Sequence, residues 1–171
     1  MTPASRSRVG RIAVVIVVVT LGLMWIYAIF VANPSATADK LDDATFPRAA
    51  QPVCSSTLED LGRLDLVNRR ASSPEDRAVL VDRTSVELAT MVQQLRSLVP
   101  PAGVDATAVS KWLDDWDQWL RDRATWSAKL HQNQDVPFNE KQRDTGEPNS
   151  RALDDFAKIN GMPACAIPAG V

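Results

Sequence analysis

The sequence predicts an all-α protein, with one N-terminal transmembrane helix and an extracytoplasmic bundle of three long helices and a short C-terminal helix, closed by one disulfide. Three observations predict this fold class. Residues 12–32 form an uncharged, mostly apolar run of 21 positions. From residue 54 onward, apolar side chains recur every three or four positions, as on one face of a helix, and no segment shows the alternation typical of a strand. The two cysteines lie near the two ends of this helical part.

The run Ile12–Ala32 has the length of a membrane-spanning helix, because a hydrocarbon core about 30 Å thick needs about 20 apolar residues. Three arginines lie in residues 1–11, whereas the first charge after the run is Asp39. The positive-inside rule therefore places residues 1–11 in the cytoplasm and the rest of the chain outside. A secretory signal cleaved after Ala38 is the alternative, since Ala36-Thr37-Ala38 has the small-x-small pattern of a cleavage site. The usual apolar core of such a signal, about 7–15 residues, is shorter than this run.

The charge distribution is asymmetric along the chain. Three of the 19 Lys and Arg residues lie in the N-terminal segment, and all 21 Asp and Glu residues follow position 38. The remaining chain thus has 16 basic and 21 acidic residues, a formal charge of −5. An acidic external domain is a poor candidate for binding nucleic acid, whose phosphates need a basic surface.

Residues 33–53 contain three prolines and no sustained periodicity, which predicts an extended linker. The domain is then expected over residues 54–171. Its first helix is predicted from Ser56, because Ser56-Thr57-Leu58-Glu59 has the spacing of a capping box.

The next helix has the clearest start, because serine at 73 can cap a helix and Pro74 suits the first helical position. Its periodicity ends at Pro100-Pro101. A third helix is expected over about 106–131 and a polar loop over 132–150. The last helix is expected over about 151–160, with Gly161 as its stop signal.

Cys54 and Cys165 lie 111 positions apart, both on the extracytoplasmic side of the predicted membrane helix. Two cysteines outside the cytoplasm predict one structural disulfide. A redox-active pair is the alternative, but such pairs usually occur as Cys-x-x-Cys, a motif that this sequence lacks.

The third helix holds four of the five tryptophans, in the segment KWLDDWDQWLRDRATW over residues 111–126. On a helical wheel Trp112 and Trp116 lie inside the apolar face, which predicts that they are core residues. Trp119 and Trp126 lie at its edge, and Arg123 falls among the apolar positions, where its guanidinium can lie across either ring. Two roles stay open for Arg123. One is structural pairing with a carboxylate, from Asp82, Glu87, Asp154 or Asp155. The other is the cationic floor of an aromatic groove for an anionic ligand.

Catalytic and metal sites have little support in the sequence. Asp114, Asp115 and Asp117 point in different directions on the polar face of the third helix, so they do not form a converging pair. The single histidine, His131, lies at a helix end, and the sequence has no metal-ligand cluster, phosphate loop or nucleophile-elbow motif. The sequence therefore predicts neither an enzyme nor a bound cofactor or metal.

Two segments carry a resemblance to a known group of proteins. Trp112–Trp116 with Arg121-Asp122-Arg123, and the tail from Asp154 through Asn160-Gly161-Met162-Pro163-Ala164-Cys165, resemble uncharacterised actinobacterial single-pass membrane proteins with a small extracytoplasmic helical domain. The resemblance covers about residues 54–171. It implies a membrane location and supplies no catalytic residues.

The expected function is that of a non-enzymatic, membrane-anchored cell-envelope protein that acts as an interaction or accessory module. Its partners would be the lipid bilayer, through residues 12–32, and a protein of the membrane or envelope. The alternative is a binding module for a small or lipid-like envelope ligand in a groove formed by Trp119, Arg123 and Trp126. A pocket in which Arg123 has no carboxylate partner would favour the ligand module, whereas a filled core with an external apolar patch would favour the interaction module.

Overall fold

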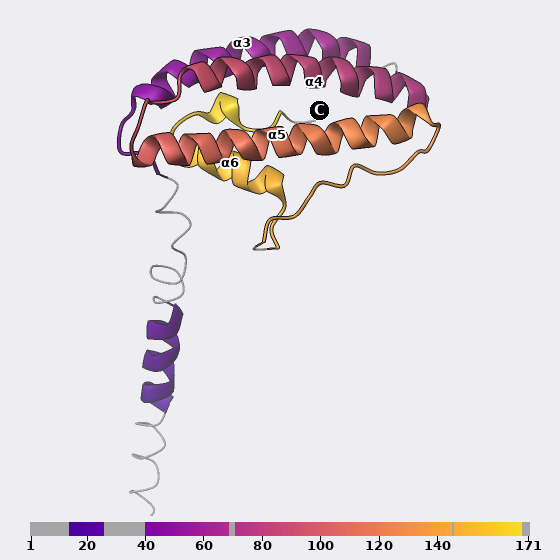
Figure 1. Ribbon diagram of the computed structural model, residues 1–171. Helices are drawn as coiled ribbons and strands as arrows, with labels where there is room; N and C mark the ends of the chain where they lie inside the picture. Colours follow the sequence, from indigo (N-terminus) through magenta and orange to yellow (C-terminus); the bar gives the residue numbers. More distant parts are fainter. Residues whose placement is uncertain (1–13, 26–39, 69–70, 145, 169–171) are drawn as a thin grey trace, which may run out of the picture. The chain divides into compact units, whose positions relative to one another are not determined.

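The structure is a computed structural model of the chain, and it describes residues 14–25, 40–68, 71–144 and 146–168. These residues form helices and no strand, which confirms the all-α class. The chain divides into two compact units, Met1–Ala38 and Asp39–Val171. The second unit contains α3 (Thr45–Asn68), α4 (Pro74–Ser97), α5 (Val104–His131), α6 (Asn149–Ile159) and the 3₁₀ helix η1 (Pro163–Cys165) (Figure 1).

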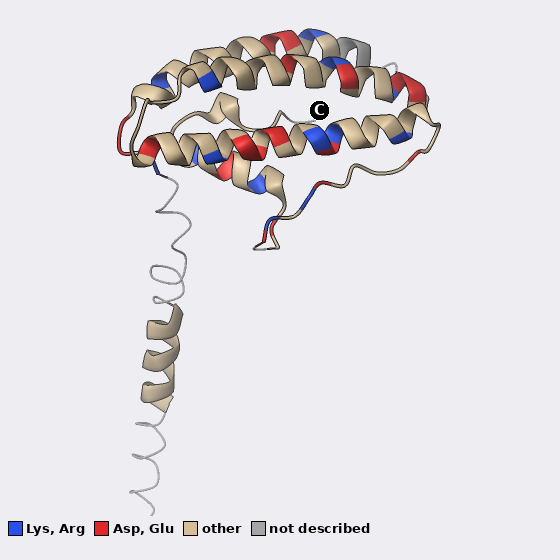
Figure 2. Cartoon of the chain, in the orientation of Figure 1, with Lys and Arg blue, Asp and Glu red and all other residues tan. Residues whose placement is uncertain are grey.

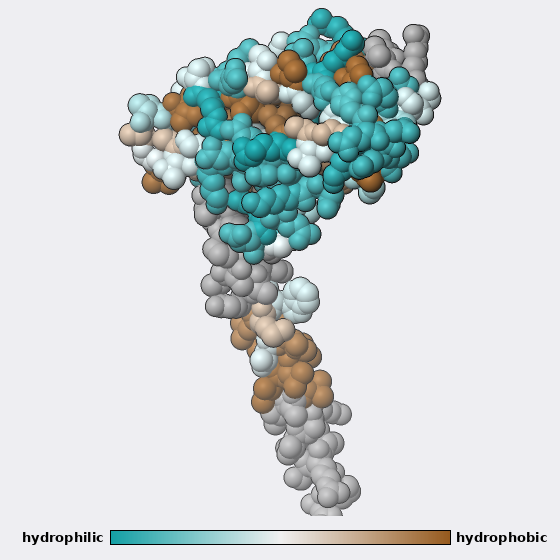
Figure 3. Space-filling view, turned by 45° about the vertical axis from the view of Figure 1, so that its right-hand side comes forward, coloured by the Kyte–Doolittle hydropathy of each residue, from teal (hydrophilic) through white to brown (hydrophobic). Residues whose placement is uncertain are grey.

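In the first unit, residues 14–25 are helical and their apolar side chains, from Val14 to Trp25, are exposed. This helix is the hydrophobic segment of Figure 3. Within the described ranges, no helix is both long enough and apolar enough to cross a membrane. The predicted span over 12–32 continues at both ends outside these ranges. The basic segment 1–11 and the cleavage pattern at 36–38 also lie outside them.

Helix α3 begins at Thr45, well before the predicted start at Ser56, so the linker prediction over residues 33–53 is wrong for residues 45–53. Pro47 lies in the first turn, where backbone N–H groups have no helical acceptor, and Pro52 is accommodated inside the helix. Phe46, Ala50 and Cys54 recur every four residues and are all buried, so this added length packs into the core.

The predicted start of α4 is confirmed in detail. The Ser73 hydroxyl accepts the Asp76 N–H at 3.1 Å, and the Asp76 carboxylate accepts the Ser73 N–H at 3.2 Å. This reciprocal arrangement is a capping box, with Pro74 at the first helical position. The helix ends at Ser97, before the two prolines.

Helices α5 and α6 also lie close to their predicted ranges. The end of α5 is closed by two hydrogen bonds, from the Asn133 N–H to the Leu130 carbonyl (2.8 Å) and from the Gln134 N–H to the Lys129 carbonyl (3.0 Å). Asn133 has the left-handed φ of 60° that such a helix end requires. Gly161, with φ of 70°, follows α6 as predicted.

The helices of the second unit pack around a main core, and a smaller buried cluster lies beside it. Helix α4 packs on both α3 and α5, α6 packs on α5, and η1 contacts both α3 and α6, which closes the ring of contacts (Figure 1). The main cluster joins the following buried residues: Leu41, Phe46, Ala50, Cys54, Leu61, Leu88, Met91, Val92, Leu95, Val109, Trp112, Leu113, Trp116, Trp119, Leu153, Phe156, Ala157, Met162 and Cys165. Hydrophilic residues cover most of the face of this unit in Figure 3.

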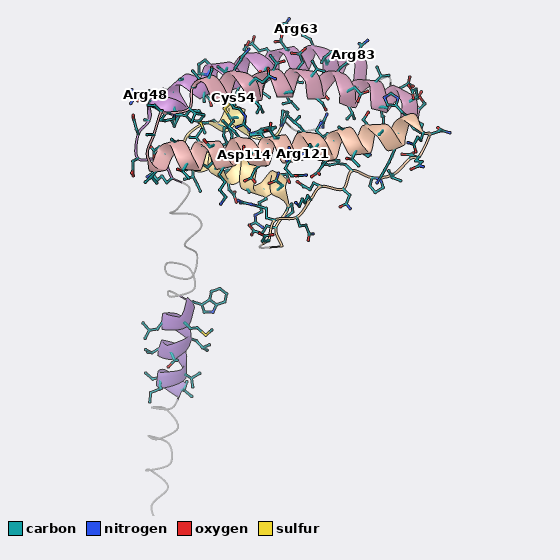
Figure 4. The ribbon with its side chains drawn as sticks, in the orientation of Figure 1. Arg48, Cys54, Arg63, Arg83, Asp114 and Arg121 are labelled. Atoms are coloured by element: carbon teal, nitrogen blue, oxygen red, sulfur yellow. A yellow bond between two sulfur atoms is a disulfide. The ribbon has the colours of Figure 1, made fainter. Side chains whose placement is uncertain are left out.

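The predicted disulfide between Cys54 and Cys165 is present, with a Cα–Cα distance of 5.0 Å. Cys54 lies within α3 (Figure 4) and Cys165 ends η1, and both are fully buried. The bond therefore fastens the C-terminal segment to α3. The segment that precedes α3 is also fastened, because the Leu41 N–H donates to the Asn160 side chain at 2.8 Å.

Two buried tryptophans of α5 offer a matched pair of substitutions. Trp112 donates its indole N–H to the Leu153 carbonyl at 3.2 Å, whereas the indole N–H of Trp116 is buried with no hydrogen-bond partner among the described residues. Both Trp→Phe changes remove similar volume, but only Trp112→Phe removes a hydrogen bond. We expect Trp112→Phe to lower the free energy of unfolding by about 1 kcal/mol more than Trp116→Phe. Denaturant unfolding followed by circular dichroism measures this difference, and equal losses would contradict it.

Candidate functional site

The burial of the four α5 tryptophans follows the helical wheel, except that Trp119 is more buried than predicted. Trp112 and Trp116 are buried, and Trp112 stacks on Phe156 of α6 with ring centroids 5.0 Å apart. Trp119, predicted at the edge, is only 2% exposed. Trp126 is half-buried and packs against a second small cluster, formed by Ala78, Val81 and Leu130.

Arg123 is almost completely enclosed, with 1% of its surface exposed. Its guanidinium carbon lies 4.9 Å from the centre of the Trp119 ring, which confirms the predicted cation–π contact. Nε donates to the Ser85 hydroxyl at 3.0 Å, and Nη2 donates to the Thr84 hydroxyl at 2.6 Å and to the Val81 carbonyl at 3.4 Å. The acceptors all come from α4, so the side chain joins α5 to α4.

Among the described residues, the Arg123 guanidinium forms no ion pair. None of the predicted carboxylates therefore binds it directly. Asp82 acts on it through charge alone. Burial lowers the pKa of Arg123 from its ordinary value to about 10, and the nearby Asp82 carboxylate opposes this decrease. Arg123 therefore remains charged at neutral pH while being held by neutral acceptors and one aromatic face.

Phe138 fills the position where the aromatic groove was expected. Its ring centroid lies 6.0 Å from that of Trp119 and 5.4 Å from that of Trp126. The Val136 carbonyl, two residues before Phe138, accepts the Trp126 indole N–H at 2.8 Å. Phe138 thus joins Trp119 and Trp126, and the loop from α5 to α6 covers these two rings, whereas Arg123 contacts Trp119 and α4.

The contact of Phe138 with the two tryptophans was not predicted from the sequence. Val136 and Phe138 are the two large apolar residues in the otherwise polar stretch 132–150, and that contrast is the signal that could have identified the covering segment.

Serine, aspartate and histidine side chains meet near the end of α5, but not in the order of a hydrolase triad. The buried Ser127 hydroxyl lies 2.5 Å from Asp82 Oδ1, and His131 Nε2 lies 2.8 Å from Asp82 Oδ2. A serine nucleophile needs its hydroxyl on the imidazole, which would accept its proton. Here the carboxylate lies between serine and histidine, so Ser127 has no base of that kind.

His131 lies between two carboxylates of α4. Its Nδ1 is 3.0 Å from both carboxylate oxygens of Glu75, while Nε2 faces Asp82. The hydrogen bonds with Asp82 and then Glu75 raise the pKa of His131 above 6.5. Burial alone would raise the pKa of Asp82, but its hydrogen bonds with His131 and Ser127 and the positive charges of His131 and Arg123 outweigh burial and lower it.

Figure 2 shows acidic and basic residues interspersed along α5. Three of its aspartates bind arginines. Asp114, labelled in Figure 4, and Asp117 both bind Arg96 of α4, at 2.9 and 2.5 Å. Asp115 lies 3.3 Å from Arg143 of the loop. Asp114 and Asp117 therefore converge on one guanidinium nitrogen, because residues three positions apart share a helix face, and the prediction that no two of these carboxylates converge is wrong for this pair. Asp115 binds a different arginine, as expected.

One shallow depression lies between α5, α6 and the loop. The residues that line it are Ala108, Lys111, Trp112, Asp115, Arg143, Ala152 and Phe156. Its basic Arg143 already binds Asp115, and it lies outside the Trp119–Arg123–Trp126 cluster. Among the residues that the structure describes, no group of His, Cys, Asp and Glu side chains could hold a metal ion.

Comparison with known proteins adds no assignment, since no family model, no curated protein and no solved structure matches the chain.

Proposed function

We propose that the chain is a non-enzymatic, membrane-anchored cell-envelope protein whose helical unit acts as an interaction or accessory module. One observation carries the proposal. The side chains best suited to catalysis or ligand binding are those of Arg123, Ser127 and His131. All three bind other side chains of the same unit. This arrangement favours a structural role for them.

The proposed location outside the cytoplasm is supported by the disulfide. Disulfides persist in oxidising compartments and are rare in the cytosol. The apolar run over 12–32, with arginines before it, supports an anchor whose C-terminal side is extracytoplasmic. The resemblance to actinobacterial single-pass membrane proteins agrees with this location.

The second candidate is a binding module for a small or lipid-like ligand at Trp119, Arg123 and Trp126. Phe138 favours it, because its ring shows that the space beside the two tryptophans accepts an aromatic or apolar group. A ligand would have to displace the loop that carries Phe138. External apolar side chains are sparse among the described residues of this unit, where the large exposed ones are Val79, Val86 and Val104. An external apolar patch is the feature expected of an interaction module, so the small exposed apolar surface supports the ligand module as the second candidate.

Phe138→Ala separates these two candidates. Truncation of the ring should lower the free energy of unfolding by about 3 kcal/mol if Phe138 is a closed structural contact. In that case the purified variant should also contain no bound small molecule. Calorimetry and native mass spectrometry of the purified variant measure both properties. Stability within about 0.5 kcal/mol of the parent, together with a retained lipid or other small molecule, would favour the ligand module.

The interaction module is tested by mild detergent extraction from the native membrane, followed by affinity purification and mass spectrometry. We expect the chain in the membrane fraction with a reproducible protein partner. A monomer that carries a stoichiometric small molecule would contradict the interaction module. Recovery of a chain that lacks residues 1–38 would contradict the membrane anchor but would not contradict the interaction module.

A further inference from the structure

The end of α5 and the start of α4 are joined by one imidazole that faces a carboxylate on each side. His131 is the last residue of α5, and Glu75 lies in the first turn of α4, with Asp82 about two turns further along. The two ring nitrogens therefore contact two separate points of α4.

The geometry requires a protonated ring. A carboxylate at neutral pH only accepts hydrogen bonds, and a neutral imidazole has one donor and one acceptor nitrogen. With carboxylates at both nitrogens, the neutral ring would place its acceptor nitrogen against a carboxylate. Only the imidazolium donates to Glu75 and Asp82 at once.

The surroundings favour the positive charge. His131 also lies at the C-terminal end of α5, where the helix dipole favours a cation. The charged groups that face it are Glu75 and Asp82, and Arg123 faces Asp82 from the interior side of α5. The nearby Arg77 and Asp135 side chains bind each other. Their pair links α4 to the loop that begins immediately after His131.

We propose that His131, Glu75 and Asp82 form a pH-responsive clamp, which holds the start of α4 against the end of α5 while His131 is protonated and opens on the Glu75 side when the proton leaves. Asp82 keeps its hydrogen bond with Ser127, so the Asp82 side stays closed. Among the described residues, Glu75 has no hydrogen bond or ion pair besides those with His131, and both side chains are exposed.

The sign of the pH dependence follows from the higher pKa of His131 in the folded protein. Its contribution to stability is fully present below 6.5, the ordinary pKa of histidine, and is lost as the pH rises through the folded-state value. Opening is therefore expected on the alkaline side of 6.5, and the clamp is closed in mildly acidic surroundings.

The full-length protein in detergent tests the clamp directly, because it has one histidine and NMR therefore reports one imidazole. The midpoint of its titration should lie above 6.5, and Glu75→Gln should lower that midpoint. Glu59→Gln, at an exposed site on α3, is the matched control and should leave it unchanged. A midpoint at or below 6.5, or equal midpoints for the parent and Glu75→Gln, would overturn the proposal.

Hydrogen exchange provides the structural readout. Between pH 5.5 and 8.5, after correction for intrinsic exchange rates, protection of the first turns of α4 should fall about threefold in the parent protein, a change in the range of an exposed ion pair. His131→Gln should show low protection at both pH values, and the first turns of α5 should not respond in either protein. The same pH response in His131→Gln as in the parent would refute the clamp.

Discussion

Replacing Cys54 and Cys165 together by alanine is expected to lower the free energy of unfolding by about 4 kcal/mol. The disulfide closes a loop of 111 residues, and cross-links that close loops of about this length remove the most entropy from the unfolded chain. It also fastens η1 to α3, and η1 in turn contacts α6. Denaturant unfolding of the double variant and of the oxidised parent measures the loss.

The single variants Cys54→Ala and Cys165→Ala should each lose about as much stability as the double variant, because one bond is broken in all three. Ser56→Ala, at an exposed position of α3, is the control and should change stability by less than about 0.5 kcal/mol. A double variant as stable as this control would mean that packing of η1 is sufficient without the bond.

Arg123→Ala is expected to lower the free energy of unfolding by about 3 kcal/mol. The substitution leaves a cavity beside Trp119. It also removes the guanidinium N–H groups that donate hydrogen bonds to the Ser85 and Thr84 hydroxyls. The loss should appear in urea unfolding monitored by circular dichroism, as a lower midpoint with an unchanged slope.

Arg123→Met is the informative control, because methionine fills much of the same volume without a charge. Replacing a buried charge by an apolar side chain of similar size often costs little, so we expect a loss of about 1 kcal/mol or less. This order of effects identifies packing as the main contribution of Arg123. If both variants instead keep the parent's stability but lose a bound anionic molecule, the ligand module replaces the structural role.

The sequence predicted those features that depend on local rules. Ser73 and Pro74 define the start of α4 through capping and a preset backbone angle, and neither requires knowledge of the rest of the fold. The apolar face of α5 was likewise predictable, since helical geometry alone places Trp112 and Trp116 together. The disulfide followed from the number of cysteines and the predicted compartment.

Features that depend on long-range packing were missed. Pro47 and Pro52 indicated a linker, but burial of Phe46, Ala50 and Cys54 stabilises a helix through both prolines. Helix propensity is a weak guide where tertiary contacts oppose it.

The hydrogen-bond partners of Arg123 were not predicted, for a related reason, although Asp82, one of the expected carboxylates, does act on its charge. A buried guanidinium was expected to need a carboxylate, whereas two hydroxyls, a carbonyl and the Trp119 ring surround it. Phe138 lies twelve residues beyond Trp126 along the chain, so its contact depends on the path of the loop. No sequence periodicity reports that path.

The redox state of the cysteines in the native cell tests the central claim most directly, since that claim is a disulfide-closed helical unit outside the cytoplasm. Cells are quenched with acid, and their proteins are treated with a maleimide-linked polymer before and after reduction. We predict no shift of the band before reduction and a shift corresponding to two labelled thiols after it. Two reactive thiols before reduction would contradict both the closed fold and its extracytoplasmic location.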